Sequence, residues 1–148
     1  MLVDEQTGLA SRRAFHEALL RADSAASGGS PVSIVLADVR HLAEANEEHG
    51  HAFGDRLLRI VADLLVRAVP EATIVARVGG DEFALLLEGI DEDGCASVAS
   101  DVEASARHHP GLDGRPFALT VGYASCPPQK TVGLAFAVAG ERLVQLRR

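Results

Sequence analysis

The chain has 148 residues, of which 47% are hydrophobic, so it is long enough for one domain with a substantial core. Its formal net charge of −7 argues against broad contact with nucleic acid or with an anionic membrane surface. No uninterrupted apolar stretch approaches the roughly eighteen residues that a membrane span requires. Cys95 and Cys126 are too few for a disulfide framework, which indicates a reducing compartment. We expect a cytoplasmic location, either alone or as the cytosolic part of a larger or membrane-tethered protein.

Hydrophobic periodicity divides the chain into helices and strands. Apolar residues that recur at three- and four-residue steps predict five helices, at residues 11–26, 41–50, 55–69, 95–108 and 132–148. Shorter apolar runs predict four strands, at residues 32–37, 73–76, 84–87 and 117–124. Ser11 is expected to cap the first helix. This order indicates an α/β (α+β) domain with a mixed, mostly antiparallel sheet.

Asp38 follows the first predicted strand directly. The preceding run, Val32–Ala37, is apolar nearly throughout, as is typical of a central strand that is buried on both faces. Because a rigid sheet fixes the position of a carboxylate at its edge, Asp38 is a candidate metal ligand. The alternative is that Asp38 caps the helix that comes next.

Gly79 and Gly80 separate two strand-like runs, so they predict a β-hairpin with the glycine pair in its turn. Glycine permits positive φ, and its lack of a Cβ atom lets a ligand approach the backbone. Asp81 and Glu82 come next, and a bare backbone beside two carboxylates suits a polyphosphate with its magnesium ion. On the hairpin alone, an ordinary Gly-Gly turn with solubilising acidic residues is the simpler interpretation.

Asn46 and Asp55 bracket a glycine-containing turn between the second and third predicted helices. Asparagine offers a donor and an acceptor, and aspartate offers acceptors only. Together they can bind the edge of guanine, where N1–H and the 2-amino group are adjacent donors. The alternative is helix capping, for which both residue types are common.

The segment Gly79–Phe83 reads GGDEF, and it resembles the signature of the diguanylate cyclase (GGDEF) family. Three further segments resemble motifs of that family, in the same order along the chain. They are Asp4–Phe15 (D-x-L-T-G-L-x-N-R-R-x-F in the family), Asn46–Asp55 (N-D-x-x-G-H-x-x-G-D) and Thr120–Gly122 (S-I-G). The resemblance implies a palm-like nucleotide-cyclase fold, with a central five-stranded sheet flanked by helices and a β-hairpin that carries GGDEF. We expect residues 1–148 to be a single GGDEF domain of a longer multidomain protein.

The resemblance also implies a reaction, in which two facing domains of a homodimer condense two GTP into cyclic di-GMP and two pyrophosphates with Mg²⁺ or Mn²⁺. The implied metal ligands are Asp38, the backbone carbonyl of Val39, and Asp81. The implied catalytic carboxylates are Asp81 and Glu82. The implied substrate-binding residues are Asn46, Asp55, Gly79, Gly80 and Arg147. Arg40 is a further candidate for binding substrate, because its guanidinium group is a phosphate donor.

Several positions depart from the family pattern. Arg40 stands where the family has a second aspartate, and Ala43 stands where it has a phosphate-facing lysine. In the last helix, Gly140 replaces an aspartate, while Arg147 keeps the charge of a lysine. The chain ends before the family's G-R-N segment, so a further phosphate-binding arginine is either absent or outside this sequence. We favour an active enzyme over the alternative, a catalytically impaired GTP-binding module that regulates an adjoining domain.

The family's product-inhibition site is an R-x-x-D motif before the hairpin, and Pro70 and Thr73 occupy its two charged positions. Neither residue can form the ionic contact to the product, so we expect no feedback inhibition through that site. Sensor or EAL-type domains are the expected neighbours in a full-length chain.

Overall fold

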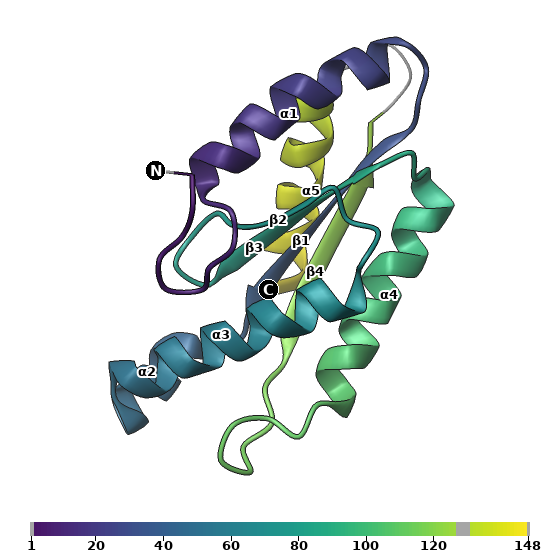
Figure 1. The fold of residues 1–148 in the computed structure, drawn as a ribbon. Coiled ribbons are helices and arrows are strands. Elements are labelled where there is room, and N and C mark those ends of the chain that lie inside the picture. The colour runs from purple at the N-terminus through teal and green to yellow at the C-terminus, as the bar shows by residue number, and fades with distance from the viewer. Residues whose placement is uncertain (1, 127–130, 148) are drawn as a thin grey trace.

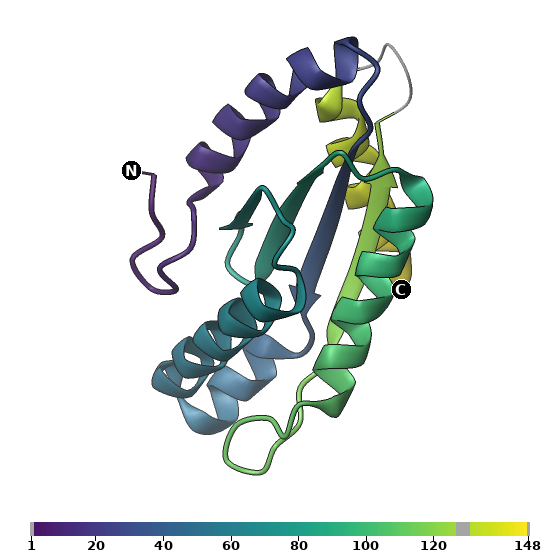
Figure 2. The same cartoon turned by 45° about the vertical axis from the view of Figure 1, so that its right-hand side comes forward.

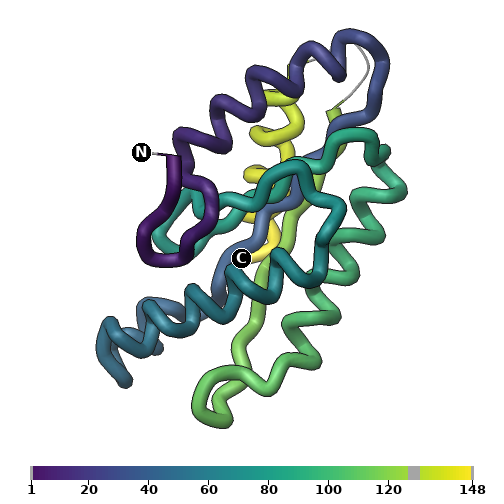
Figure 3. The backbone as a smooth tube through the Cα atoms, viewed as in Figure 1, coloured from purple at the N-terminus to yellow at the C-terminus, as the bar shows by residue number. Residues whose placement is uncertain are grey.

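The computed structural model describes residues 2–126 and 131–147 (Figures 1 and 3). The helices are α1 (Arg12–Ser27), α2 (Leu42–His49), α3 (His51–Ala68), α4 (Glu92–His108) and α5 (Val132–Arg147). The strands are β1 (Val32–Val39), β2 (Ile74–Arg77), β3 (Glu82–Glu88) and β4 (Leu119–Ser125). None of the helices in these two ranges is both long and apolar enough to cross a membrane.

The four strands form one sheet in the order β2-β3-β1-β4, and each strand pair is antiparallel. The predicted class, a sheet flanked by helices, is confirmed. The expectation of five strands is wrong for the described residues, which contain four in this sheet. A parallel contact does occur, as an isolated bridge between Ala10 and Ala76, where the N-terminal segment runs beside the edge strand β2.

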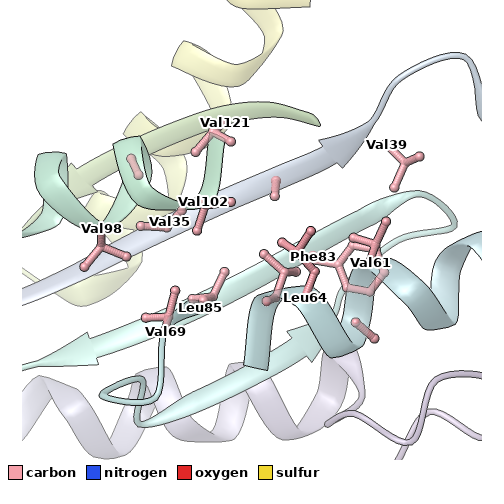
Figure 4. Close-up of a cluster of buried hydrophobic side chains, with 14 of the residues drawn as sticks. Val35, Val39, Val61, Leu64, Val69, Phe83, Leu85, Val98, Val102 and Val121 are labelled. Atoms are coloured by element: carbon pink, nitrogen blue, oxygen red, sulfur yellow. The ribbon is translucent and has the colours of Figure 1, made fainter. Parts of the chain in front are cut away.

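Helices cover both faces of the sheet (Figures 1 and 2). Alternate residues of a strand project to opposite faces, so the strands contribute residues to two hydrophobic clusters, one on each face of the sheet. One packs against α3 and α4, and Figure 4 shows its side chains, among them Val35, Phe83 and Val121. The other packs against α1 and α5 and includes Ile34 and Leu86. All eight residues of β1 are buried, which confirms the prediction of a central strand.

Two helices begin earlier than predicted. Helix α3 begins at His51, directly after Gly50, whose φ of 85° breaks the chain direction after α2. Helix α4 begins at Glu92, because the Asp91 side chain accepts a hydrogen bond from the Gly94 amide at 2.9 Å and caps it. The predicted cap of α1 is confirmed, since Ser11 accepts a hydrogen bond from the amide of residue 14 at 3.2 Å.

Gly122 allows α5 to pack closely against β4. A Cβ atom on Gly122 would lie 2.7 Å from the Ala139 carbonyl oxygen and 2.9 Å from the Leu143 amide nitrogen, too close for any side chain. The helix backbone therefore rests directly on the sheet at this position. Arg147 lies about one turn beyond Leu143, so this contact sets the height at which the end of α5 meets the sheet.

Candidate active site

Three polar side chains lie in a row across the sheet, one each on β3, β1 and β4. Asp38 on β1 pairs with Glu82 on β3 and with Thr120 on β4. Directly opposite residues share a face of the sheet, so all three lie on the face that α1 and α5 cover. The capping alternative for Asp38 is wrong, because the N-cap of α2 is His41 and no side chain caps that helix.

Arg147, at the end of α5, forms ion pairs with two of these carboxylates. Its Nε atom lies 2.6 Å from Asp38 Oδ2, and its Nη2 atom lies 3.7 Å from Glu82 Oε2. Asp38 is only 4% exposed, so little solvent screens the shorter pair. The side chain predicted to bind phosphate thus contacts the carboxylate predicted to bind metal.

The positive charge of Arg147 does not balance the negative charge at this position. Burial, together with the negative charge of Asp81, raises the pKa of Asp38 to about 7, although Arg147 opposes both effects. Burial also raises the pKa of Glu82, again against the effect of Arg147. A bound cation would favour the ionised carboxylates and would resolve this excess of negative charge.

A cavity of about 210 Å³ adjoins Asp38 and the hairpin turn. Its lining residues are Asp38, Val39, Arg40, His41, Asp81, Thr120 and Arg147. Among the described residues, neither Asp38 Oδ1 nor Thr120 Oγ1 has a hydrogen-bond partner, although both atoms are buried. Buried polar atoms are rarely left unpaired in folded proteins, so these two oxygens indicate a site for a ligand.

The donor set fits Mg²⁺ or Mn²⁺. Within residues 2–126 and 131–147, no three His, Cys, Asp or Glu side chains are grouped to hold a metal ion by themselves. Mg²⁺ is commonly bound by one or two carboxylates and substrate phosphates, which is what Asp38 and Asp81 could offer. The Val39 amide donates to the Asp81 carbonyl at 2.9 Å, which holds the end of β1 against the hairpin turn. The metal-binding roles of Asp38, Val39 and Asp81 stay predictions that these residues fit.

The predicted hairpin is confirmed, with Gly79 and Gly80 in the turn between β2 and β3. Neither glycine uses the positive φ that this residue type permits. A Cβ atom on Gly80 would meet nothing within 4 Å, so the backbone there is open to an approaching ligand. Arg77 holds the turn from behind, because its Nε and Nη2 donate to the carbonyls of Gly79 and Gly80 at 3.2 and 2.7 Å.

Asn46 and Asp55 lie on neighbouring helices, α2 and α3. Neither is at a helix start, because α2 begins at residue 42 and α3 at residue 51, so the capping alternative is wrong. The Asn46 side chain packs against Gly54, where a Cβ atom would lie 1.8 Å from Asn46 Oδ1. Within the described part of the chain, this buried Oδ1 atom also has no hydrogen-bond partner. Gly54, which precedes Asp55 in the sequence, thus leaves room for the Asn46 amide.

The positions that depart from the family pattern lie around the same region. Arg40 is exposed and lines the cavity beside Asp38, so it adds a positive charge there. Ala43 is exposed in the first turn of α2 and offers no charge. Gly140 lines a second cavity, of about 530 Å³, with Glu82 and Arg147 among its other lining residues.

Two residues of the first cavity were not among the predicted site residues. The sequence indicates Thr120 only as part of the Thr120–Gly122 strand motif. Its position beside Asp38 depends on strand register, which the sequence alone does not give. His41 adopts a left-handed conformation, with φ of 59°, and its Nδ1 atom lies 2.7 Å from Glu44 Oε2. Such a conformation is uncommon outside glycine, and no local sequence signal predicts it here.

Comparison with known proteins gives consistent similarities. A family model described as diguanylate cyclase, GGDEF domain, matches residues 1–148. An uncharacterized protein in the hutH 5′ region of Streptomyces griseus is 42% identical over 106 residues, which are 67% of this chain and 42% of that protein. Diguanylate cyclase VdcA of Vibrio cholerae is 35% identical over 85 residues, which are 57% of this chain and 24% of that protein. This chain therefore spans less than half the length of either relative.

The fold is similar to a solved structure. The GGDEF domain of DgcB from Caulobacter crescentus, in complex with c-di-GMP, superimposes with a TM-score of 0.85 at 27% identity. The match covers 99% of this chain and 88% of that one.

Proposed function

Because the chain belongs to the diguanylate cyclase GGDEF family, we propose that it is a diguanylate cyclase domain that converts two GTP into cyclic di-GMP and two pyrophosphates. The observation that carries this proposal is the cavity lined by Asp38 and Asp81, together with the buried Asp38 Oδ1 atom, which has no hydrogen-bond partner among the described residues. A solubilising acidic hairpin would leave these groups in solvent, and it would not account for a buried aspartate.

In the proposed binding mode, Asn46 and Asp55 bind the guanine base and the hairpin turn faces the phosphates. The open backbone at Gly80 lets phosphate oxygens come close, and Arg40 and Arg147 offer positive charge at the cavity. Asp38, the Val39 carbonyl and Asp81 would hold Mg²⁺ or Mn²⁺. The bound cation would neutralise phosphate charge and lower the pKa of the attacking hydroxyl.

Two domains would have to face each other, since each binds one GTP. The 3′ oxygen of one nucleotide forms a bond to the α-phosphorus of the other, and the bond from that phosphorus to the bridging oxygen breaks to release pyrophosphate. A second such step, with the roles of the two nucleotides exchanged, closes the ring and releases the second pyrophosphate. Asp81 and Glu82 are the carboxylates that would accept the hydroxyl proton. Burial raises the pKa of Glu82, which makes it a stronger base than a carboxylate in solvent. The chain's own contribution is alignment and charge compensation, which are the main demands of phosphoryl transfer.

A second function, a GTP-binding module that regulates an adjoining domain, is favoured by the same departures that weaken catalysis. Arg40 replaces a family aspartate at the lining of the cavity, and Ala43 offers no charge to a phosphate. Sensor or EAL-type domains in a full-length protein are the partners that we propose in either case. We place the domain in the cytoplasm, with no nucleic acid or membrane among its partners.

Nucleotide chromatography after incubation with GTP and Mg²⁺ tests the proposal. Cyclic di-GMP and pyrophosphate are the expected products. Asp81→Asn should abolish this synthesis and remove the metal dependence of GTP binding, because it halves the charge of the carboxylate pair with little change in size. Asp101→Asn removes an exposed charge from α4 and is the matched control, with no expected effect. Metal-dependent GTP binding without product would support the regulatory module.

A further inference from the structure

Thr120 stands out among the buried hydroxyl groups of the sheet. It is 7% exposed, and its Oγ1 atom has no hydrogen-bond partner among the described residues. Ser33, the other buried hydroxyl residue of the sheet, lies 2.6 Å from both the Ile90 carbonyl and the Ser125 hydroxyl. A valine has the same shape as threonine and would fill the position without an unpaired polar atom. Folding therefore gives no reason for a hydroxyl at position 120.

The position of Thr120 does give a reason. It pairs with Asp38 across β1 and β4, and both residues line the cavity of about 210 Å³. The second buried oxygen without a partner in the described chain, Asp38 Oδ1, belongs to this pair. The ionised carboxylate accepts hydrogen bonds only, and the hydroxyl can accept them as well, so a species with several donors can satisfy both.

Water bound to a divalent cation is such a species. Mg²⁺ retains several of its water ligands in protein sites, and these waters are hydrogen-bond donors. Protein groups that hydrogen-bond to the ligands of a metal ion orient those ligands, and the loss of such a group weakens metal binding by about 10- to 100-fold. The hydroxyl of Thr120 can accept a hydrogen bond from this water while the carboxylate of Asp38 faces the cation.

We propose that Thr120 is a positioning residue of the cation site, whose hydroxyl accepts a hydrogen bond from a cation-bound water and so fixes the cation against Asp38 and Asp81. This inference rests on the proposed function, since it requires the divalent cation that accompanies GTP. Thr120 itself contacts neither nucleotide nor metal in this arrangement.

The test compares Thr120→Val, which removes only the hydroxyl, with Thr120→Ser, which retains it. Mn²⁺ binding is measured by the electron paramagnetic resonance signal of free Mn²⁺, in the presence of a GTP analogue with a methylene bridge between the α and β phosphorus atoms. Thr120→Val should weaken Mn²⁺ binding about 10- to 100-fold, and Thr120→Ser should bind nearly as the wild type does. Thr73→Val, at a hydroxyl beyond the cavity, should have no effect.

Thermal unfolding without nucleotide and metal supplies a second readout. Because Thr120→Val removes an unpaired buried group, its melting temperature should equal or exceed that of the wild type. A lowered melting temperature with unchanged Mn²⁺ affinity would assign Thr120 a structural role and overturn the inference. Asp38→Asn distinguishes a failure of the role of Thr120 from a failure of the proposed cation site. If it abolishes Mn²⁺ binding and Thr120→Val does not weaken it, only the role of Thr120 fails. If Asp38→Asn has no effect, the proposed cation site fails and the inference fails with it.

Discussion

The Nε atom of Arg147 lies 2.6 Å from Asp38 Oδ2, so the last turn of α5 places a positive charge on the most buried carboxylate of the site. A divalent cation would have to share or displace this contact, because both ions require the same carboxylate. GTP phosphates would offer Arg147 an alternative partner. Arginine and cation are therefore expected to compete when nucleotide is absent and to bind together when it is present.

Replacing Arg147 tests this competition. Arg147→Gln should strengthen binding of Mn²⁺ alone, since Asp38 loses its competing partner, and should weaken GTP binding, since a phosphate contact is lost. Isothermal titration with each ligand measures both effects. Arg142→Gln is the matched control on the same helix, because the Arg142 guanidinium donates to the Tyr123 carbonyl at 2.6 Å and is not a lining residue of the cavity beside Asp38. Two changes of the same sign in Arg147→Gln would contradict the competition.

Gly54 is expected to be essential for guanine recognition. Gly54→Ala would place a Cβ atom on the Asn46 amide and should weaken GTP binding by about 1 to 3 kcal/mol, roughly five- to 150-fold, through loss of a base contact. Wild-type protein should bind GTP well above ATP, because adenine lacks the two adjacent donors. Gly133→Ala is the control, since a Cβ atom there meets only one atom, at 3.9 Å. Equal titration curves for GTP and ATP would refute the role of Asn46 and Asp55.

Asp38 should make stability depend on pH. Its pKa rises from 3.8 to about 7 on folding, so the folded state favours the protonated carboxyl. The associated stability is complete below about pH 4 and is lost as the pH rises through about 7. Asp38→Asn stays neutral, so the melting temperature of this variant minus that of the wild type should increase from pH 4 to 7 and then level off. A difference that does not change with pH would count against the raised pKa.

Restoring the family pattern tests whether the departures impair catalysis. Arg40→Asp together with Ala43→Lys should raise the rate of cyclic di-GMP synthesis, because it returns an acidic group and a phosphate-binding charge to the two positions. The rate is followed by chromatography of the products. A slower double variant would show that Arg40 itself binds phosphate in the wild type. An inactive double variant that still binds GTP would show that the defect lies elsewhere, with Gly140 as the next position to restore.

Cyclic di-GMP should not inhibit through the position before the hairpin. Pro70 is exposed, and Thr73 accepts a hydrogen bond from the Glu88 amide at 3.3 Å, so neither offers a charge to the product. Inhibition constants for added cyclic di-GMP would be compared between the wild type and Pro70→Arg with Thr73→Asp. Only the double variant should show inhibition at this position, and tight inhibition of the wild type that depends on Arg77 would disprove the prediction.

Features of the fold that depend on neighbouring residues could be predicted from the sequence, whereas contacts between distant segments could not. Local patterns predicted the buried β1, the hairpin and the periodic helices, because each depends on neighbouring residues. The early start of α3 was missed, since Gly50 begins it without a capping side chain. The contact of Arg147 with Asp38 depends on how closely α5 docks at Gly122, and the place of Thr120 depends on register. Both arise from tertiary packing between distant segments, which periodicity does not report.

Arg77 joins two segments that are far apart in sequence, the turn at Asp4 and the turn at Gly79 and Gly80. Figure 3 shows the N-terminal segment, in purple, beside the teal hairpin between β2 and β3. The Nη1 atom of Arg77 lies 3.5 Å from Asp4 Oδ2, while its other nitrogens hold the two glycine carbonyls. The N-terminal turn cannot separate from the sheet without releasing the guanidinium group that supports the hairpin turn. In native-state hydrogen exchange, the amides of the two turns should therefore open as one cooperative unit, with a shared free energy of opening.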